Sequence, residues 1–390
     1  MLKVLVISHY VPPYNEVASL RVGDWIEALC STGFEVDVLT TRKGLLDEQP
    51  FSSRSSVIAL KTRVWQSIYS LAWRINSFVK QYIPLFLFHR HMIWLIKEFI
   101  SPTFQREYDL VISSSSPIHV HMIAWIYVKK NDAKWIADLR DLWVDNHLVR
   151  YQGIVRWLET HVERFYLGRA SYIVVVSRGA KLTLNARGYD RVKVLMNGVK
   201  FNKSELINTE QCVTPVSGCA SDLKIVYTGT LYDLFPLKEI FDVIECADGV
   251  SLACYGNASR SILELLRSYE NCRYLGKLDY GAALSKQRDA DILLFFGHFD
   301  RKRADVTNGG VISGKIFEYL ESGRPIIALV ENSSRELQHL IEPFEGVYCV
   351  SYSDFKSFDF SKIDLSPCKR DLREFNRLDN FERFIRENIL

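Results

Sequence analysis

The sequence predicts an α/β protein with two parallel sheets in tandem. A length of 390 residues exceeds what one hydrophobic core usually supports. Short runs of Val, Ile and Leu alternate with segments of helical length in both halves of the chain. Most of these runs are continuous and do not alternate with polar residues, which is typical of strands buried on both faces of a parallel sheet.

Thirteen apolar runs are expected to be strands. Those of the first half are Lys3–Ser8, Glu35–Thr41, Val57–Lys61, Leu110–Ser113, Trp135–Leu139, Tyr172–Ser177 and Lys193–Met196. Those of the second half are Lys224–Thr228, Ser251–Tyr255, Cys272–Leu275, Ile292–Phe296, Pro325–Val330 and Val347–Ser351. Between them, Arg21–Thr32 and Leu237–Cys246 show helical periodicity.

The segment 202–222 is polar and aperiodic, so it is expected to link two domains. Residues 369–390 place apolar side chains at helical spacing among charges, which predicts a terminal amphipathic helix. We therefore expect an N-terminal domain at 1–203 and a C-terminal domain at 204–369. The last helix, 370–390, is expected to pack back on the first domain.

Bulk composition excludes several classes of protein. A net charge of +3 is too small to indicate nucleic-acid binding. The eight cysteines form no C-x-x-C pair, which favours reduced thiols in a cytoplasmic protein over disulfides or zinc. Met1–Lys3 leads directly into an apolar run without a small-residue cleavage site, so no signal peptide is expected. No run of 18 apolar residues occurs in the sequence, so no membrane-spanning helix is expected.

The segment from Gly309 to Leu320 is the most informative motif. A loop with Gly309 and Gly310 precedes Ser313, Gly314 and Lys315, where a helix is expected to begin. Free amides at such a position, with a lysine, can bind an anion.

One turn later, Glu318 is suited to bind a ribose diol, so the segment indicates a nucleotide site. Ile316 follows Lys315, so no hydroxyl stands where a Walker A loop binds magnesium. The alternative is an ordinary capped helix after a loop.

These residues and further motifs resemble the retaining glycosyltransferases of family four, which have the GT-B fold of two Rossmann-like domains facing an interdomain cleft. The resemblance extends over nearly the whole chain and is greatest to the branch that builds bacterial cell-surface polysaccharides. It includes residues 7–13, Arg21, 108–117, 135–143, 175–177, 197–199, 227–232 and 315–328.

The resemblance implies a set of donor-binding residues. Lys315 and the amides of Ser313 and Gly314 match the positions that bind the donor pyrophosphate, and Glu318 matches the position that binds the ribose. Gly229 and Thr230 match a loop close to the phosphates. Asn197 and Gly198 match a motif that faces the cleft.

Two positions depart from the family pattern. Gly310 stands where the family usually has a glutamate that contacts the donor sugar. Thr230 stands where it often has an arginine, and Lys238 is a candidate to supply that charge at a different spacing.

Catalytic residues are expected at the carboxyl end of the strand Trp135–Leu139. A carboxyl end of a parallel strand presents ligand-binding groups, which points to Asp138, Arg140 and Asp141. The resemblance makes Asp141 the strongest candidate, because a His-Asp pair occupies the places of Arg140 and Asp141 in many relatives. Arg140 itself cannot act as a base at neutral pH. A structural Asp–Arg pair is the alternative for this segment. His9 follows the first strand and is expected either to contact a sugar or to cap the chain.

Residues 60–107 combine ten aromatic residues with seven basic and two acidic ones. A basic, aromatic stretch suits the surface of an anionic membrane, where a lipid-linked acceptor would be reached. The alternative is a pair of helices packed on their own sheet.

The expected function is a metal-independent, retaining glycosyltransferase without a cofactor. It would transfer a sugar from a nucleotide sugar, most simply a UDP-sugar, to a lipid-linked saccharide. A sugar-nucleotide epimerase and a catalytically silent scaffold of the same fold remain as alternatives.

Overall fold

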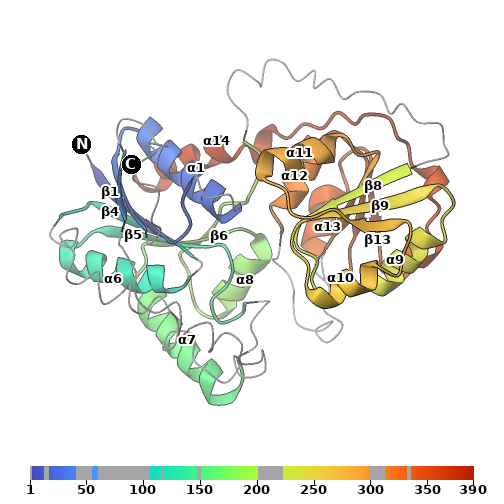
Figure 1. The fold of residues 1–390 in the computed structure, drawn as a ribbon. Helices are drawn as coiled ribbons and strands as arrows, with labels where there is room; N and C mark the ends of the chain where they lie inside the picture. Colours follow the sequence, from blue (N-terminus) through green and yellow to red (C-terminus); the bar gives the residue numbers. More distant parts are fainter. Residues whose placement is uncertain are drawn as a thin grey trace. The chain divides into compact units, whose positions relative to one another are not determined.

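The computed structural model describes residues 2–12, 17–40, 55–59, 106–115, 117–146, 151–200, 223–297, 312–331 and 335–390. The chain divides into two compact units, one formed by Met1–Met196 with Arg377–Leu390 and the other by Asn197–Asn376 (Figure 1). The expected linker, 202–222, lies outside the described residues.

The first unit contains a seven-stranded parallel sheet with the order β3-β2-β1-β4-β5-β6-β7. Its strands are β1 (Lys3–Ser8), β2 (Glu35–Thr40), β3 (Ser55–Ala59), β4 (Leu110–Ser115), β5 (Lys134–Leu139), β6 (Tyr172–Val175) and β7 (Val192–Val194). The register aligns Ser8 with Ser114, and Ser114 with Asp138, so three polar residues form one row across β1, β4 and β5.

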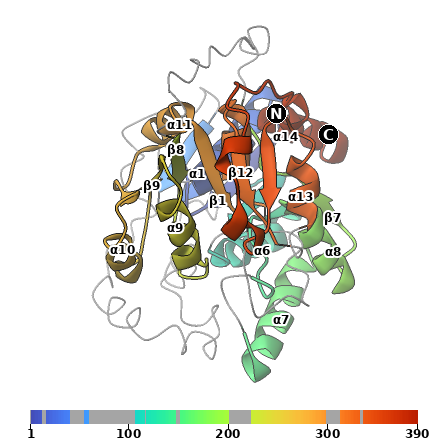
Figure 2. The same cartoon turned by 90° about the vertical axis from the view of Figure 1, so that its right-hand side faces the viewer.

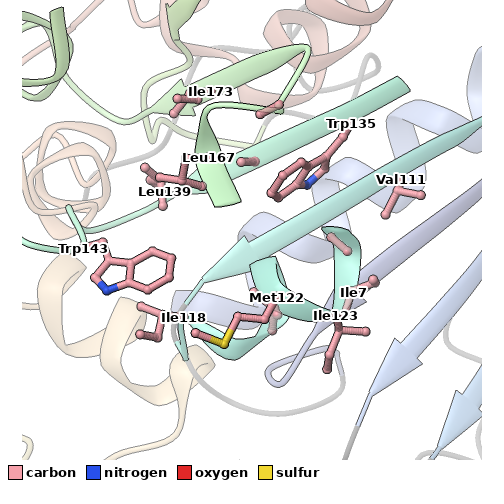
Figure 3. Packing of buried hydrophobic residues seen from close by; sticks show 14 of the residues in the cluster. Ile7, Val111, Ile118, Met122, Ile123, Trp135, Leu139, Trp143, Leu167 and Ile173 are labelled. Atoms are coloured by element: carbon pink, nitrogen blue, oxygen red, sulfur yellow. The ribbon is translucent and has the colours of Figure 1, made fainter. Parts of the chain in front are cut away.

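Side chains on alternate positions of β1 enter different cores, because successive residues of a strand point to opposite faces. Val4 and Val6 pack with α1 (Val17–Ser31) and α14 (Arg377–Asn388). Leu5 and Ile7 belong to the core on the other face, where Figure 3 shows Ile7 among its neighbours. That core includes residues of α6 (His119–Asn131), α7 (Gly153–Leu167) and α8 (Arg178–Ala186).

The second unit contains a six-stranded parallel sheet with the order β10-β9-β8-β11-β12-β13. Its strands are β8 (Leu223–Thr228), β9 (Val250–Tyr255), β10 (Cys272–Tyr274), β11 (Ile292–Phe296), β12 (Ile326–Leu329) and β13 (Val347–Val350). Its helices are α9 (Leu237–Glu245), α10 (Arg260–Leu266), α11 (Tyr280–Arg288), α12 (Lys315–Glu321) and α13 (Arg335–Ile341). Figure 2 shows this sheet from a second side, with α9 and α10 together on one face.

The α/β class and all thirteen expected strands are confirmed, with boundaries that shift by at most two residues. The expected helix at 369–390 is shorter, because it begins only at Arg377. Residues 373–375 form a 3-10 turn, and Asn376 pairs with Val199 in a β-bridge that keeps it out of the helix. Within the described ranges, no helix has the length and apolar character that crossing a membrane requires.

Candidate functional site

The carboxyl ends of β1, β4 and β5 lie side by side in the first sheet. The chain proceeds outward from β1 in one direction and from β4 in the other, so the sheet reverses its order between these two strands. Such a switch point is the usual ligand-binding edge of a parallel α/β sheet. His9 follows β1, and Arg140 and Asp141 follow β5, so these candidates lie on loops that leave the same edge.

Asp138 is fully buried at this edge and accepts hydrogen bonds from two helical residues and one neighbouring strand. The guanidinium of Arg21 on α1 binds both carboxylate oxygens, at 2.8 to 3.1 Å. The indole Nε1 of Trp25 donates at 3.2 Å and the hydroxyl of Ser114 at 2.8 Å. Hydrogen-bond donors of the protein thus surround the carboxylate of Asp138.

This environment keeps Asp138 ionised. Burial alone would raise the pKa of the carboxyl, but the charge of Arg21 and the hydrogen bonds from Arg21 and Ser114 outweigh it and hold the pKa below its usual value. A buried, ionised and multiply bonded carboxylate is suited to fix α1 against β4 and β5. The contacts therefore favour the structural reading of Asp138, with Arg21 as its partner.

Arg140 connects the loops at the edge of the sheet. Its Nε donates to the backbone oxygen of Ser115, the last residue of β4, and its guanidinium carbon lies 5.9 Å from the ring centre of Tyr10 after β1. Burial lowers the pKa of Arg140, and the neighbouring charges of Asp141 and Asp138 oppose that shift. Arg140 thus stays a cation at neutral pH.

Asp141 is exposed, whereas His9 is only 8% exposed. The ring of His9 lies edge-on to the ring of Tyr10, with 4.8 Å between the ring centres. The backbone oxygen of His9 accepts a hydrogen bond from Thr40 at 3.4 Å. Of the candidates in this unit, Asp141 is thus the carboxylate that solvent and a ligand can reach.

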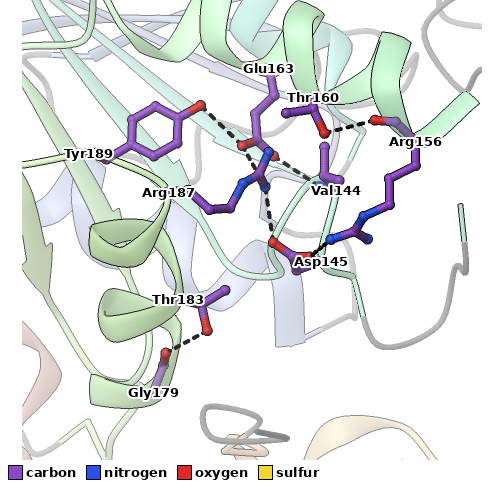
Figure 4. A network of polar contacts seen from close by, with 9 residues as sticks. All are labelled: Val144, Asp145, Arg156, Thr160, Glu163, Gly179, Thr183, Arg187 and Tyr189. Carbon is purple, nitrogen blue, oxygen red and sulfur yellow. Dashed lines mark hydrogen bonds and ion pairs between the residues drawn. The ribbon is translucent and has the colours of Figure 1, made fainter. Parts of the chain in front are cut away.

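The segment that follows Asp141 is anchored on α7 by two buried glutamates. Glu159 accepts from the indole of Trp143 at 2.7 Å, and Glu163 accepts from the amide of Val144 at 2.9 Å. Burial raises the pKa of Glu163, against the opposing charge of Arg187 at 2.9 Å. Figure 4 shows the contacts around Glu163, where Asp145 also binds Arg187 and Arg156. These contacts hold in place the loop that presents Asp141.

In the second sheet the order reverses between β8 and β11, which gives a second edge of the same kind. Gly229 follows β8 with a φ of +145°, which favours glycine. A Cβ atom at this position would lie only 1.5 Å from the Nζ atom of Lys315 on α12. The glycine therefore leaves the space that the lysine ammonium occupies.

Lys315 is held as a cation of reduced basicity. Its Nζ atom lies 5.3 Å from the ring centre of Tyr227, beside the Gly229 backbone. Burial lowers the pKa of Lys315 to about 8, and the nearby charge of Glu318 opposes the shift. A partly desolvated ammonium beside a glycine loop is suited to bind an anion that approaches the backbone closely.

A second glycine, Gly256 after β9, supports the Gly229 loop. Its φ is +127°, and a Cβ here would lie 2.0 Å from the backbone oxygen of Gly229. The amide of Gly229 donates to the oxygen of Tyr255 at 2.7 Å, and the amide of Leu231 donates to Asn257 at 2.8 Å. The loops after β8 and β9 are thus in backbone contact.

Glu318 lies one turn beyond Lys315 on the same face of α12. The side-chain amide of Gln287 on α11 donates to the carboxylate of Glu318 at 3.4 Å and to the hydroxyl of Thr228 at 2.9 Å. The hydroxyl of Tyr319 accepts from the amide of Thr228 at 2.8 Å. These contacts place Glu318 near the end of β8, so the structure brings Gly229, Lys315 and Glu318 together.

The remaining donor candidates are placed differently. The Ser313 hydroxyl accepts from the amide of Lys315 at 3.4 Å, and Gly314 directly precedes α12. The oxygen of Thr230 accepts from the hydroxyl of Tyr227 at 2.8 Å. Lys238 lies exposed on α9 and pairs with Asp242 on its own helix, at 2.8 Å.

Four candidates lie at or outside the limits of the described units. Gly309 and Gly310 lie outside the described residues. Asn197 and Gly198 begin the second unit, just before Val199, whose amide donates to Phe375 at 3.0 Å.

In the described ranges, no group of three or more His, Cys, Asp or Glu residues could bind a metal ion. The six described cysteines are free thiols.

The sequence reasoning did not find Gly256, Gln287 or Tyr227 as site residues. Gly256 carries a usable signal, because it directly follows a buried strand as Gly229 does. Tyr227 lies in the matched segment 227–232 but does not stand out there as a site residue, because an aromatic residue in a strand is common. Gln287 carries no signal, because an amide near a helix end is common too.

Residues 18–199 match the glycosyl transferase 4-like domain. No curated protein gives a sequence match. Among solved structures, sucrose-phosphate synthase from Thermosynechococcus elongatus has a TM-score of 0.65 at 14% identity, over 100% of this chain and 95% of that chain.

Anabaena HepE in complex with UDP and glucose has a TM-score of 0.63 at 13% identity, over 99% of both chains. The lipopolysaccharide outer core galactosyltransferase WaaB has a TM-score of 0.59 at 14% identity, over 100% of both chains. These similarities establish the GT-B fold.

Replacing Arg21 with Met should destabilise the first unit by about 3–5 kcal/mol, because Asp138 would stay buried without its partner charge. All eight tryptophans lie before residue 197, so tryptophan fluorescence during urea unfolding reports on this unit alone. Arg156→Met, which breaks a half-exposed pair, should cost at most about 1 kcal/mol. Equal losses in the two variants would contradict the structural role of Asp138.

Replacing Gly256 with Ala should displace the Gly229 loop, because the new methyl group overlaps a backbone oxygen. We expect a cost of about 3 kcal/mol and roughly a hundredfold faster hydrogen exchange in β8 and β9. Gly276→Ala is the matched control, since it has a φ of +90° with no atom within 4 Å of the added Cβ. It should cost about 1 kcal/mol. Equal hydrogen-exchange rates in the Gly256→Ala and Gly276→Ala variants would disprove the close contact between Gly256 and the backbone of Gly229.

Proposed function

We propose that this chain, a glycosyltransferase by its matched domain and its GT-B fold, transfers a sugar from a nucleotide sugar to a lipid-linked saccharide with retention of configuration. The observation that supports this most directly is the ammonium of Lys315 beside the backbone of Gly229 at the switch point of the second sheet. A hexose carried by UDP is the simplest donor.

In this proposal the second unit binds the donor. Lys315 and the amides near Ser313 and Gly314 bind the diphosphate, which approaches the bare backbone at Gly229. Glu318 accepts hydrogen bonds from the ribose hydroxyls, and Gln287 orients its carboxylate. Anabaena HepE, which shares the fold, was solved with UDP and glucose, and this supports UDP as the nucleotide.

The first unit binds the acceptor. During transfer, the bond between the sugar's anomeric carbon and the diphosphate oxygen breaks, and the acceptor hydroxyl forms the new bond and loses its proton. Asp141 is the exposed carboxylate suited to accept that proton, while Arg140 and His9 line the same edge. Asp138 positions this edge through Arg21 and is not proposed to contact the substrate.

The mechanism proposed here is independent of a metal ion or other cofactor. The leaving diphosphate gains negative charge in the transition state, and a positioned ammonium stabilises such charge strongly in a site that excludes water. Lys315 supplies that charge. Lys238 is not part of this proposal, because Asp242 already neutralises it on the α9 surface.

The lipid-linked acceptor is supported by the sequence at 60–107, which is basic and aromatic and lies outside the described residues except at its end. WaaB, a lipopolysaccharide outer core galactosyltransferase, shares the fold. Together with the scattered cysteines, this supports a cytoplasmic enzyme on the inner face of a bacterial membrane, in cell-surface polysaccharide synthesis.

A catalytically silent scaffold is the second candidate, suggested by Gly310 in place of the family's usual glutamate. Since Lys315 and Glu318 are present, such a scaffold would still bind a nucleotide. Only a measurement of turnover therefore distinguishes the scaffold from the glycosyltransferase. A sugar-nucleotide epimerase would release a changed nucleotide sugar without any acceptor.

The test is a panel of nucleotide sugars incubated with the full-length protein and lipid-linked saccharides. We expect transfer from one UDP-sugar with an α-linked donor to give an α-linked product. Lys315→Met should reduce kcat/KM by about 100- to 1,000-fold, because it removes charge stabilisation of the leaving group. UDP binding without turnover on any donor would favour the scaffold, and an inverted product would exclude retention.

UDP binding should depend on pH through Lys315. Its pKa of about 8 means that raising the pH through 8 removes the positive charge, so UDP should bind progressively more weakly above that pH. Titration calorimetry from pH 7 to pH 9 should show a loss of about tenfold. Lys315→Met should bind weakly at every pH with no such step, and a step of equal size in this variant would assign the titration to another group.

A further inference from the structure

Helix α7 places its acidic residues inside the protein and apolar residues outside. Glu159 and Glu163 are fully buried, where they anchor the loop after β5. By contrast, Ile154 is 73% exposed, Trp157 57% and Phe165 49%. Large apolar side chains at these exposures are not explained by the core of the unit.

The exposed apolar residues form one stripe. Ile154, Trp157, His161 and Phe165 follow one another at intervals of three or four positions, which places them on one side of a helix. The rings of Trp157 and His161 lie 4.1 Å apart, and the ring of Phe165 lies 5.4 Å from that of Trp125 on α6. The stripe is about 16 Å long, from the helical rise per residue.

Basic side chains accompany the stripe. Arg164 and Arg169 are exposed, and the guanidinium carbon of Arg169 lies 5.0 Å from the ring centre of Phe165. The ammonium of Lys129 lies 5.3 Å from the ring centre of Trp125. Because both carboxylates of α7 are buried, this helix exposes no acidic side chain. We call these residues, with the stripe, the α7 surface.

We infer that the α7 surface binds the surface of an anionic lipid bilayer. Tryptophan and phenylalanine insert at the boundary between headgroups and acyl chains, and arginine and lysine bind anionic headgroups from the same depth. A second copy of this chain fits the α7 surface less well, since pairing two such surfaces would bring the same positive charges together. The inference deepens the proposed function, because a lipid-linked acceptor is reached from such a surface.

The test is sedimentation of the full-length protein with vesicles of phosphatidylcholine alone or mixed with phosphatidylglycerol. We expect binding to the anionic vesicles that weakens at high salt. Trp157→Glu, and separately Arg164→Gln with Arg169→Gln, should each weaken it by about tenfold.

Two matched controls should bind vesicles like the wild type. Leu275→Glu adds the same charge at a 51% exposed apolar residue of the second unit. Arg156→Gln removes an arginine from α7 that pairs with Asp145 away from the stripe. UDP binding measured on every variant verifies that the donor site remains folded.

Unchanged vesicle binding by Trp157→Glu would overturn the inference, and so would equal binding of the wild type to neutral vesicles. A lower solution mass of Trp157→Glu without lipid would assign the surface to self-association instead. If Trp65→Glu with Trp73→Glu abolishes binding while Trp157→Glu does not, the α7 inference fails and the lipid-linked acceptor stands. Transfer to a lipid-linked acceptor tests the proposed function separately.

Discussion

The buried charge of Asp138 is the constraint on which the first unit depends. A carboxylate without water must receive donors from the protein, and here they come from α1 and β4. Arg21, which supplies the opposite charge, also lies 5.1 Å from the ring centre of Phe381 on the last helix. One ionic contact therefore joins β5, the strand that precedes Arg140 and Asp141, to both helices of one face.

The two units position the loops at their ligand-binding edges in different ways. Each presents polar groups where a parallel sheet reverses its order, because strand ends there leave room between diverging loops. The first unit fixes its loops with buried carboxyl groups, at Asp138, Glu159 and Glu163. The second uses the absence of side chains at Gly229 and Gly256, which lets two backbones and an ammonium share a small volume. The first arrangement positions an exposed carboxylate, and the second positions a cation.

The sequence predicts the fold well, because runs such as Val4–Ile7 and Ile292–Phe296 are apolar on both faces and suit only buried strands. It also predicts that Gly229, Lys315 and Glu318 share a site, which the contacts support. It cannot predict partners that depend on tertiary structure. Arg21, the partner of Asp138, precedes it by 117 positions in the sequence. The start of α14 depends on the β-bridge between Asn376 and Val199.

The first unit is discontinuous in sequence, since its last fourteen residues follow the whole of the second. Trp25 packs its ring against Phe381 and Phe384, at 4.6 and 5.7 Å between ring centres. A ribosome makes Trp25 long before it makes these two partners, and the second unit is complete in between. The nascent chain must therefore keep an apolar face of its first unit uncovered until Arg377–Leu390 have been made. A premature stop before Arg377 would damage the part of the enzyme that was synthesised first.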